Sequence, residues 1–457
     1  MENKGKTKFS RAFWVANSVE LLERMAYYGV FIVLTIYLSS VMGFSDIESG
    51  LISGVFSGIL YFLPTFSGAI ADKIGFRQSM LLAFGLLTLG YTGLGVLPTM
   101  LENAGLVQYD LTTHFSGLRE SSARWAIVPV LALIMVGGSF IKSVITGTVA
   151  KETTPDTRAK GFSLFYMMVN IGAFSGKLIV EPLRKGMGSE GLVVLNYFSA
   201  VMTLIAFLAV YFLYKSTHHE GQGKTFKEIG DALIKVLTNG RLITITLIIS
   251  GFWIVYYQLY ATMPKYVLRM AGESATPAWY ANVNPLIVVL LVNSITHLMR
   301  NKSAVTSMTI GMLIMPVSAL VMASGNLFGE AEMFGMHPVA VMMVCGIALQ
   351  ALAETFISPR FLEYFSLQAP KGDEGMYLGF SHLHSFISSI LGFGLSGFLL
   401  SKYCPDPSLF ASVAEWKAAS VHAHYIWYYF AVIALVAAFA LFVFGIVTRK
   451  MDAKKSI

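Results

Sequence analysis

The chain has 457 residues, of which 55% are hydrophobic and only 13% are charged, and its mean hydropathy is +0.64. A soluble domain carries about 25% charged residues, so this composition excludes an ordinary soluble protein and indicates an integral membrane protein. The net charge of +7 does not indicate a nucleic-acid binder, because Lys and Arg concentrate in alternate loops between apolar segments.

Apolar segments of membrane-spanning length recur along the whole chain and predict an all-α membrane protein. The distribution of Lys and Arg places both termini in the cytoplasm, which requires an even number of spans. We expect two sets of six spans, in regions 1–214 and 241–457, joined by a cytoplasmic linker at 215–240. The expected spans are 12–39, 47–71, 79–101, 125–150, 161–182, 191–214, 241–268, 277–299, 304–324, 337–362, 376–401 and 424–447.

The first expected span contains three charged residues, Glu20, Glu23 and Arg24. One charge at the centre of a bilayer costs roughly 2.5–3.5 kcal/mol on insertion scales, so three are tolerated only when they face protein or a wet cavity. At helical spacing they share one face with Tyr27 and Tyr28. This helix is therefore predicted to form the wall of a polar pathway.

The second expected span carries Gly50, Gly54 and Gly58, each four residues apart, which predicts close packing against another helix. The end of this span runs into a short charged turn on the cytoplasmic side. It contains Gly68, Asp72, Lys73 and Arg77.

Polar residues also lie within the fourth and fifth expected spans, as Lys142 and Asn170. Lys177 and Glu181 form an i, i+4 pair near the outer end of the fifth span. We expect this pair to snorkel to the lipid headgroups, and the alternative is that it lines an outer vestibule.

The linker contains the run TFKEIGDALIKVL, whose apolar residues at helical spacing predict an amphipathic surface helix.

In the second half, four polar or amphipathic residues lie within expected spans; they are Trp253, Tyr257, Asn284 and Glu354. Three histidines lie toward the cytoplasmic ends of spans and are expected to be solvated; they are His297, His382 and His384.

The run from Glu20 to Gly29 resembles the E-x-x-E-R-F-x-Y-Y-G signature of the proton-dependent oligopeptide transporter (POT) family, with Met25 in place of Phe. The charged turn resembles the loop between helices 2 and 3 of the major facilitator superfamily. Further resemblances follow in chain order, at Tyr61, Gly138–Lys142, Phe165–Phe174, Phe252–Trp253, Gln258, Asn284–Pro285 and Glu354–Pro359.

The resemblance covers nearly the whole chain and implies the major facilitator fold, with two six-helix bundles and a binding site between them. Further residues depart from the family pattern. Phe31 and Tyr257 stand where the family has an arginine and a glutamate that pair at the outer gate, and Ser381-His382 replaces a Trp-Phe pair. Loss of both gate charges together is consistent, since loss of one would leave the other unpaired.

The resemblance implies a proton-coupled symporter that imports di- and tripeptides by alternating access. A peptide offers a carboxylate, an ammonium and amide groups, so its site needs a cation, an anion and hydrogen-bonding side chains. The residues expected to bind substrate are Arg24, Tyr28, Tyr61, Lys142, Asn170, Trp253, Tyr257, Asn284 and Glu354. Those expected to couple protons are Glu20, Glu23, Arg24, Lys142 and Glu354.

The hypothesis for coupling starts from Glu20 and Glu23, which are like charges on one face, so at least one should resist ionisation. A substrate carboxylate that binds Arg24 would release a glutamate to take a proton. Lys142 and Glu354 could form a bridge that closes the cytoplasmic side.

The alternative hypotheses assume the same fold but a different substrate. The protein would then be a transporter of another small anionic or peptide-like solute, or a drug/proton exporter. We expect no enzyme activity, because the spans contain no paired aspartates, Ser-His dyad or His-Glu-x-x-His motif. We also expect no cofactor, no metal and no disulfide between Cys345 and Cys404, with protons as the coupling ion. The expected partners are short peptides, protons and membrane lipids, and the expected state is a monomer in the plasma (bacterial inner) membrane.

Overall fold

The computed structural model describes residues 9–107, 118, 121–215, 225–329, 331–368 and 379–455, and within them it is helical, without a β-strand. The first half contains α1 (Arg11–Phe31), α2 (Leu34–Ser40), α3 (Asp46–Phe62), α4 (Pro64–Ile74), α5 (Phe76–Asn103), η1 (Ser122–Ala126), α6 (Ile127–Lys151) and α7 (Pro155–Leu213). The helix α8 (Phe226–Thr238) follows.

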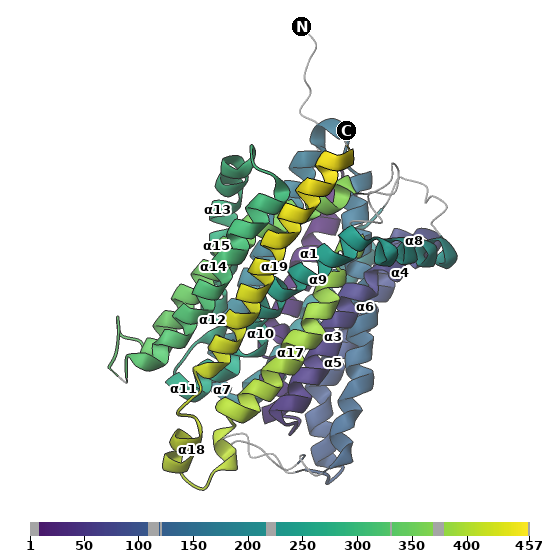
Figure 1. Ribbon diagram of the computed structural model, residues 1–457. Helices are drawn as coiled ribbons and strands as arrows, with labels where there is room; N and C mark the ends of the chain where they lie inside the picture. The colour runs from purple at the N-terminus through teal and green to yellow at the C-terminus, as the bar shows by residue number, and fades with distance from the viewer. Residues whose placement is uncertain are drawn as a thin grey trace. The chain divides into compact units, whose positions relative to one another are not determined.

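The second half contains α9 (Gly240–Tyr256), α10 (Gln258–Ala261), α11 (Met263–Ala271), α12 (Pro277–Ala281), α13 (Val283–Met299), α14 (Ala304–Ser324), η2 (Gly325–Leu327), α15 (Pro338–Leu367), α17 (Leu383–Tyr403), η3 (Pro407–Leu409), α18 (Val413–Ala419) and α19 (Tyr425–Lys455) (Figure 1).

Within the described residues, nine helices are long and apolar enough to cross a membrane, and two bent helix pairs raise this number to eleven. The pairs are α1 with α2, bent by 45°, and α3 with α4, bent by 46°. At the second bend, Pro64 has no N–H to continue the helical hydrogen bonds. The 59-residue helix α7 is about 88 Å long at 1.5 Å per residue, far more than one bilayer. Gly188, with φ 57° and ψ −132°, divides α7 into two limbs, and twelve spans in total stays a prediction.

The chain folds into two compact units, each described here by itself. The first comprises residues 1–31, 63–113 and 120–229, and the second comprises 32–62, 114–119 and 230–457. These units do not follow the chain-order halves 1–214 and 241–457, because α2 and α3 pack with the second half. The boundaries of that transferred segment coincide with the two helix bends.

The first unit is built around close packing of α1 against α7. A Cβ atom added at Gly176 would overlap the backbone carbonyl of Met25, and one at Gly172 would overlap that of Leu21. Gly29 on α1 approaches the Gly176 carbonyl in the same contact. These glycines let the two backbones approach more closely than any side chain would permit, which positions the charged face of α1.

In the second unit, α3 packs along α17 (Figure 1). A Cβ added at Gly54 would lie 3.0 Å from the Ser389 carbonyl oxygen, and one at Gly50 would overlap the Phe393 carbonyl. The hydroxyls of Ser57 and Ser389 are 3.0 Å apart in the same interface. The close packing expected from the glycine spacing is confirmed, and its partner is α17.

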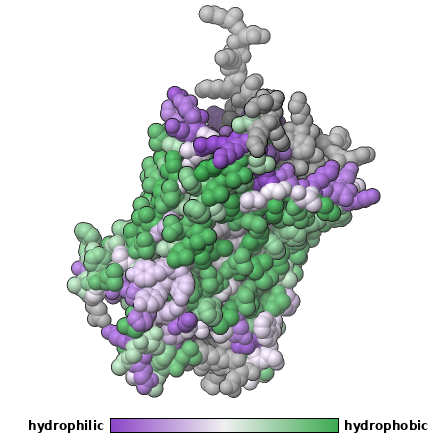
Figure 2. Space-filling view, in the orientation of Figure 1, coloured by the Kyte–Doolittle hydropathy of each residue, from purple (hydrophilic) through white to green (hydrophobic). Residues whose placement is uncertain are grey.

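Large apolar side chains are exposed along the outward face of α19, as expected of a surface that meets lipid tails (Figure 2). They include Val432, Leu435, Val436, Phe439, Phe442, Val443 and Ile446.

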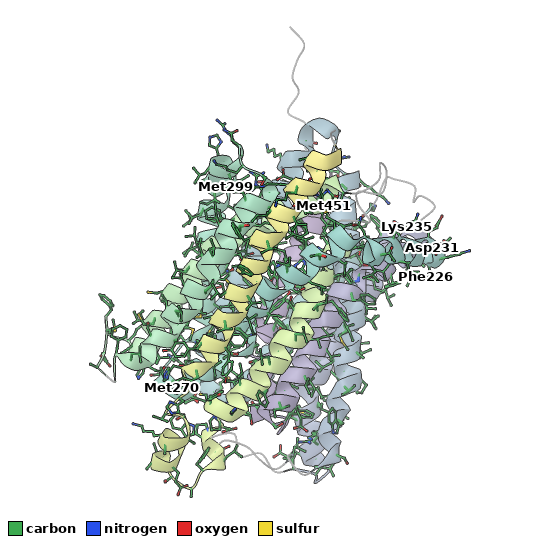
Figure 3. The ribbon with its side chains drawn as sticks, in the orientation of Figure 1. Phe226, Asp231, Lys235, Met270, Met299 and Met451 are labelled. Atoms are coloured by element: carbon green, nitrogen blue, oxygen red, sulfur yellow. The ribbon has the colours of Figure 1, made fainter. Side chains whose placement is uncertain are left out.

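The amphipathic helix expected in the linker forms as α8. Thr225 and Glu228 cap its first turn through hydrogen bonds to each other's backbone N–H groups. Ile229 and Val236 are buried, whereas the side chains of Asp231 and Lys235 project outward (Figure 3). The preceding linker residues 216–224 lie outside the described residues.

Candidate functional site

The three charged residues of α1 form one buried ion cluster in the first unit. Arg24 Nε lies 3.1 Å from Glu20 Oε1, and Arg24 Nη2 lies 2.5 Å from Glu23 Oε2. Arg24 is only 7% exposed, Glu20 4% and Glu23 2%. The i, i+4 spacing of Glu20 and Arg24 brings the first pair together along the helix. One guanidinium therefore serves two carboxylates, which makes it the centre of the cluster.

Two tyrosines and a lysine extend this cluster. The Arg24 guanidinium lies over the Tyr27 ring, 5.5 Å from its centroid, and the Tyr27 and Tyr28 rings are in edge contact at 5.2 Å. Lys142 on α6 is close enough to interact electrostatically with Arg24 and both glutamates. The predicted proton-coupling residues of the first half thus lie together. By contrast, Asn170 Nδ2 donates to the Tyr166 carbonyl of its own helix at 2.8 Å.

The expectation that Lys177 and Glu181 snorkel to headgroups is wrong. Both residues are 1% exposed within the protein, and the Lys177 ammonium lies 5.6 Å from the centroid of the Tyr28 ring. Arg184 donates to Glu181 Oε2 through Nε, and its Nη2 is also 3.0 Å from that oxygen. The close α1–α7 packing encloses these side chains, so they belong to the polar interior and not to the lipid interface.

The charged turn after the second span adopts an ordered structure in the first unit. Gly75, with φ 99°, ends α4, a conformation that side chains other than glycine rarely adopt. Arg77 Nη2 donates to the Tyr211 carbonyl at 2.8 Å, and the Lys73 ammonium lies 5.6 Å from the Phe226 ring centroid. Gly68 permits close approach to Ser143, whose hydroxyl donates to the Pro64 carbonyl at 2.8 Å. Asp72 lies in the last turn of α4, between Gly68 and Arg77 in the chain.

In the second unit, Glu354 belongs to a short hydrogen-bonded chain. Asn284 Nδ2 donates to Glu354 Oε2 at 3.1 Å, and the Tyr256 hydroxyl donates to Asn284 Oδ1 at 3.2 Å. The amide thus links an acid on α15 to a phenol on α9. Tyr256 was not predicted as a site residue, because the sequence has no signal that separates it from its neighbour Tyr257.

Aromatic rings gather around Tyr257 in the second unit. Its ring lies 6.2 Å from that of Tyr61 and 5.9 Å from that of Trp253. The His382 ring stacks on Tyr61 at 6.2 Å, and His382 is exposed as expected. The solvated position expected for His384 is wrong: it is 4% exposed, and its Nδ1 and Nε2 atoms contact the Ser381 carbonyl and the Ser385 hydroxyl.

The predicted site residues therefore form two groups, one in each compact unit. Arg24, Lys142 and their neighbours lie in the first unit, and Glu354, Asn284 and the aromatic group lie in the second. That both groups line one substrate site stays a prediction. In the part of the chain that the structure describes, no three His, Cys, Asp or Glu side chains are placed to hold a metal ion.

Glu354 is expected to bind substrate, so substitution of Tyr256 by phenylalanine should weaken substrate affinity a few-fold. The change removes the hydrogen bond that Tyr256 donates to Asn284 Oδ1 and loosens the amide that orients Glu354. A neutral hydrogen bond contributes about 1 kcal/mol, which corresponds to about fivefold in binding. The half-saturating substrate concentration in a counterflow assay measures the effect. Tyr260→Phe, on the adjacent α10, provides the control, and equal values for the two variants would contradict the prediction.

Comparison with known proteins identifies the families that this chain resembles. The Major Facilitator Superfamily profile matches residues 7–177, and the POT family profile matches residues 221–405. Dipeptide and tripeptide permease B of Aeromonas hydrophila is 25% identical over 446 residues, which cover 84% of this chain and 83% of that protein.

The fold is shared with solved transporters. A structure from work on substrate recognition in proton dependent oligopeptide transporters has a TM-score of 0.71 at 19% identity, covering 96% of this chain and 99% of that one. A POT family transporter in complex with 5-aminolevulinic acid has a TM-score of 0.73 at 16% identity, covering 96% and 97%. The chain thus belongs to the POT family of the major facilitator superfamily, a family of transporters and not of enzymes.

Proposed function

We propose that this multi-span plasma-membrane protein is a proton-coupled symporter that imports di- and tripeptides by alternating access. The observation that carries the proposal is the Arg24 guanidinium held between two buried carboxylates. A peptide carboxylate matches the fork of Arg24, and the Lys142 ammonium adds a second cation nearby. The relatives named dipeptide and tripeptide permease support a peptide as the cargo.

The other end of the peptide is assigned to the second unit. Glu354 provides an anion for the peptide ammonium, and its hydrogen bond to Asn284 fixes the carboxylate in position. Tyr28, Tyr61 and Asn170 are proposed to bond the peptide backbone, and Trp253 and Tyr257 to contact its variable side chains. Because these aromatic contacts lack directional hydrogen bonds, they suit cargo of varied side chains.

Proton coupling follows from competition for Arg24. Without substrate, Arg24 neutralises Glu20 and Glu23 together. When a peptide carboxylate binds Arg24, one glutamate loses part of its neutralising contact, and a proton taken from the external side restores the balance. Release of the peptide returns Arg24 to the glutamates and expels the proton to the cytoplasm. Lys142 and Glu354 are proposed to bridge and close the cytoplasmic side between these steps.

Other parts of the cycle are proposed on the same basis. The turn containing Asp72 is held to both the end of α7 and the start of α8, which suits a loop that transmits movement between helices. The two six-span halves, 1–214 and 241–457, are proposed to alternate around the site. The protein is proposed to function as a monomer, with protons as the coupling ion and no cofactor.

The test is uptake of a labelled dipeptide by liposomes that contain the purified protein. A gradient of one pH unit, acidic outside, stores about 1.4 kcal/mol per proton, enough for about tenfold accumulation with one proton per peptide. We expect accumulation with the gradient and only equilibration without it. Unlabelled dipeptide should compete with the label better than 5-aminolevulinic acid does. If dipeptide fails to compete and another solute accumulates, the cargo is different and the peptide assignment is wrong.

A further inference from the structure

The first unit contains a second group of buried charges that the proposed function does not use. It consists of Lys177, Glu181 and Arg184, and it is named here the α7 charge group. Lys177 and Glu181 are each 1% exposed, and Arg184 is 7% exposed. Spacings of four and three residues place the three side chains on one face of α7. Charges inside a membrane span are costly, and they are retained mainly where they serve a function.

The close contact between α1 and α7 brings Lys177 to Tyr28. Gly176 lies against the Met25 backbone carbonyl, and Gly29 approaches the Gly176 carbonyl. The lysine that follows Gly176 therefore meets the turn of α1 that carries Tyr28, and its ammonium lies 5.6 Å from the centroid of the Tyr28 ring. A cation over a tyrosine ring is an attractive contact, so the lysine is held at this ring.

Arg184 and Glu181 are held at the bend of α7. Arg184 Nε and Nη2 each lie 3.0 Å from Glu181 Oε2. A Cβ atom added at Gly191 would overlap the Leu183 backbone carbonyl, so the two limbs of α7 are in close contact beside Arg184. Gly188, with φ 57°, lies in the same turn. The packed turn therefore keeps Arg184 next to Glu181.

The α7 charge group carries one more positive than negative charge, because Lys177 and Arg184 are cations and Glu181 is the one carboxylate of the three. The ion cluster of α1 is balanced, with two cations and two carboxylates; they are Arg24, Lys142, Glu20 and Glu23. In the proposed cycle, a peptide carboxylate and one proton enter that cluster together, which leaves its net charge unchanged. The excess positive charge of the α7 charge group is therefore still present when a peptide is bound.

This excess charge lies close to the proposed position of the peptide. Tyr28 follows Arg24 by four residues, which is about 6 Å along α1 at 1.5 Å per residue. When the terminal carboxylate of a peptide binds Arg24, the side chain of the same residue is within reach of Tyr28. The Tyr28 ring is partly exposed, whereas Lys177 is enclosed, so the lysine acts across the ring through its charge. A charge in a buried environment acts several-fold more strongly than it does in water.

We propose that the α7 charge group, through Lys177, is a specificity subsite that favours peptides with an aspartate or glutamate side chain in the residue that carries the free carboxylate. This inference deepens the proposed function and rests on it for the orientation of the peptide. A second carboxylate near Tyr28 neutralises the excess positive charge, whereas a cationic side chain at the same place is repelled. The subsite therefore separates cargo by a difference of affinities, and neutral side chains are accepted without either effect.

Binding of two matched dipeptides, alanyl-glutamate and alanyl-glutamine, to the purified protein tests the subsite. The two differ in charge at nearly constant size. Isothermal titration calorimetry at neutral pH measures both affinities without a proton gradient, and a buffer without chloride excludes competition by a small anion. We expect alanyl-glutamate to bind about tenfold more tightly, a difference of about 1.4 kcal/mol, and alanyl-lysine to bind more weakly than both. Equal affinities for alanyl-glutamate and alanyl-glutamine would overturn the subsite.

Substitutions in the α7 charge group should change the ratio of these two affinities in the direction that charge dictates. Lys177→Gln removes a cation and should bring the ratio close to one, whereas Lys177→Arg should keep it near tenfold. Glu181→Gln removes the carboxylate and should raise the ratio further. Lys185→Gln, at an exposed position on the same helix, provides the matched control and should leave the ratio unchanged. A purely structural role would change both affinities together, so an unchanged ratio in Lys177→Gln would also overturn the subsite.

Arg184→Gln covers the case in which Lys177→Gln does not fold, as judged by size-exclusion chromatography. It leaves one cation against one carboxylate, so the ratio should again approach one, and a ratio that stays near tenfold would contradict the subsite. A protein that accumulates dipeptides but binds both equally refutes only the subsite.

A protein that binds neither dipeptide refutes the proposed function. Free glutamate and glutamine, matched in the same way, then test the subsite alone. Tighter binding of glutamate that is lost in Lys177→Gln would support it, and equal binding or no binding of the two would overturn it.

Discussion

Substitution of Arg24 by alanine is expected to abolish peptide uptake and to destabilise the first unit. Glu20 and Glu23 would remain buried at 4% and 2% exposure without their shared guanidinium. Removal of one partner from a buried ion pair costs about 3–5 kcal/mol, because a charge is left without compensation. The loss should appear as a lower melting temperature in detergent and as absent dipeptide accumulation in liposomes.

Three further variants separate the chemistry of Arg24 from its structural role. Arg24→Lys keeps the charge but cannot contact both glutamates through a planar fork. This variant should therefore fold normally and transport peptide poorly. Glu20→Gln and Glu23→Gln remove one carboxylate each and should lose proton-driven accumulation. Lys142→Ala should lose it as well. Accumulation at the unsubstituted level in Glu20→Gln, Glu23→Gln and Lys142→Ala would remove the coupling mechanism.

Substitution of Gly176 by alanine is expected to prevent correct packing of α1 on α7. The added methyl group would overlap the Met25 backbone carbonyl, which cannot move without displacing α1. Overpacking of a well-filled interface costs about 1–3 kcal/mol and sometimes more, and here the obstacle is backbone. Because Glu23 and Arg24 immediately precede Met25, the same displacement should disturb the ion cluster. Melting temperature and uptake should fall together.

Gly186, ten residues further along α7, provides the matched control. A Cβ added there meets no atom within 4 Å, so Gly186→Ala should fold and transport normally. It should even gain about 0.5–1 kcal/mol of helix stability, since alanine loses less backbone entropy than glycine. Equal behaviour of the two alanine variants would show that the α1–α7 contact is looser than described.

The features that the sequence predicts well are those that depend on local spacing and on the cost of charge in lipid. Glu20 and Arg24 are four residues apart on a helix, and their burial as a pair follows from that spacing and from the apolar residues around them. The close packing at Gly50 and Gly54 follows in the same way from a four-residue repeat of small residues.

The errors concern side chains whose environment depends on distant segments. Lys177 was expected at the headgroups because its place along the helix allowed it, yet α1 covers it through contacts more than 140 residues away in sequence. His384 is buried by the same kind of long-range contact, with Trp253 and Phe361 against its ring. Helical periodicity carries no information about which neighbour covers a given face.

The sequence alone determined that the protein is a bundle of membrane spans with a charged first helix, because hydropathy and helical spacing act over about twenty residues. Only the tertiary structure decided which helices enclose which charges. It grouped α2 and α3 with the second half, brought Asp46 to Lys265 and Arg269 across more than 200 residues, and linked Tyr256 to Glu354 through Asn284. The physical reason is that a buried charge specifies only that a partner must exist, whereas packing of glycine-rich helix faces selects the partner.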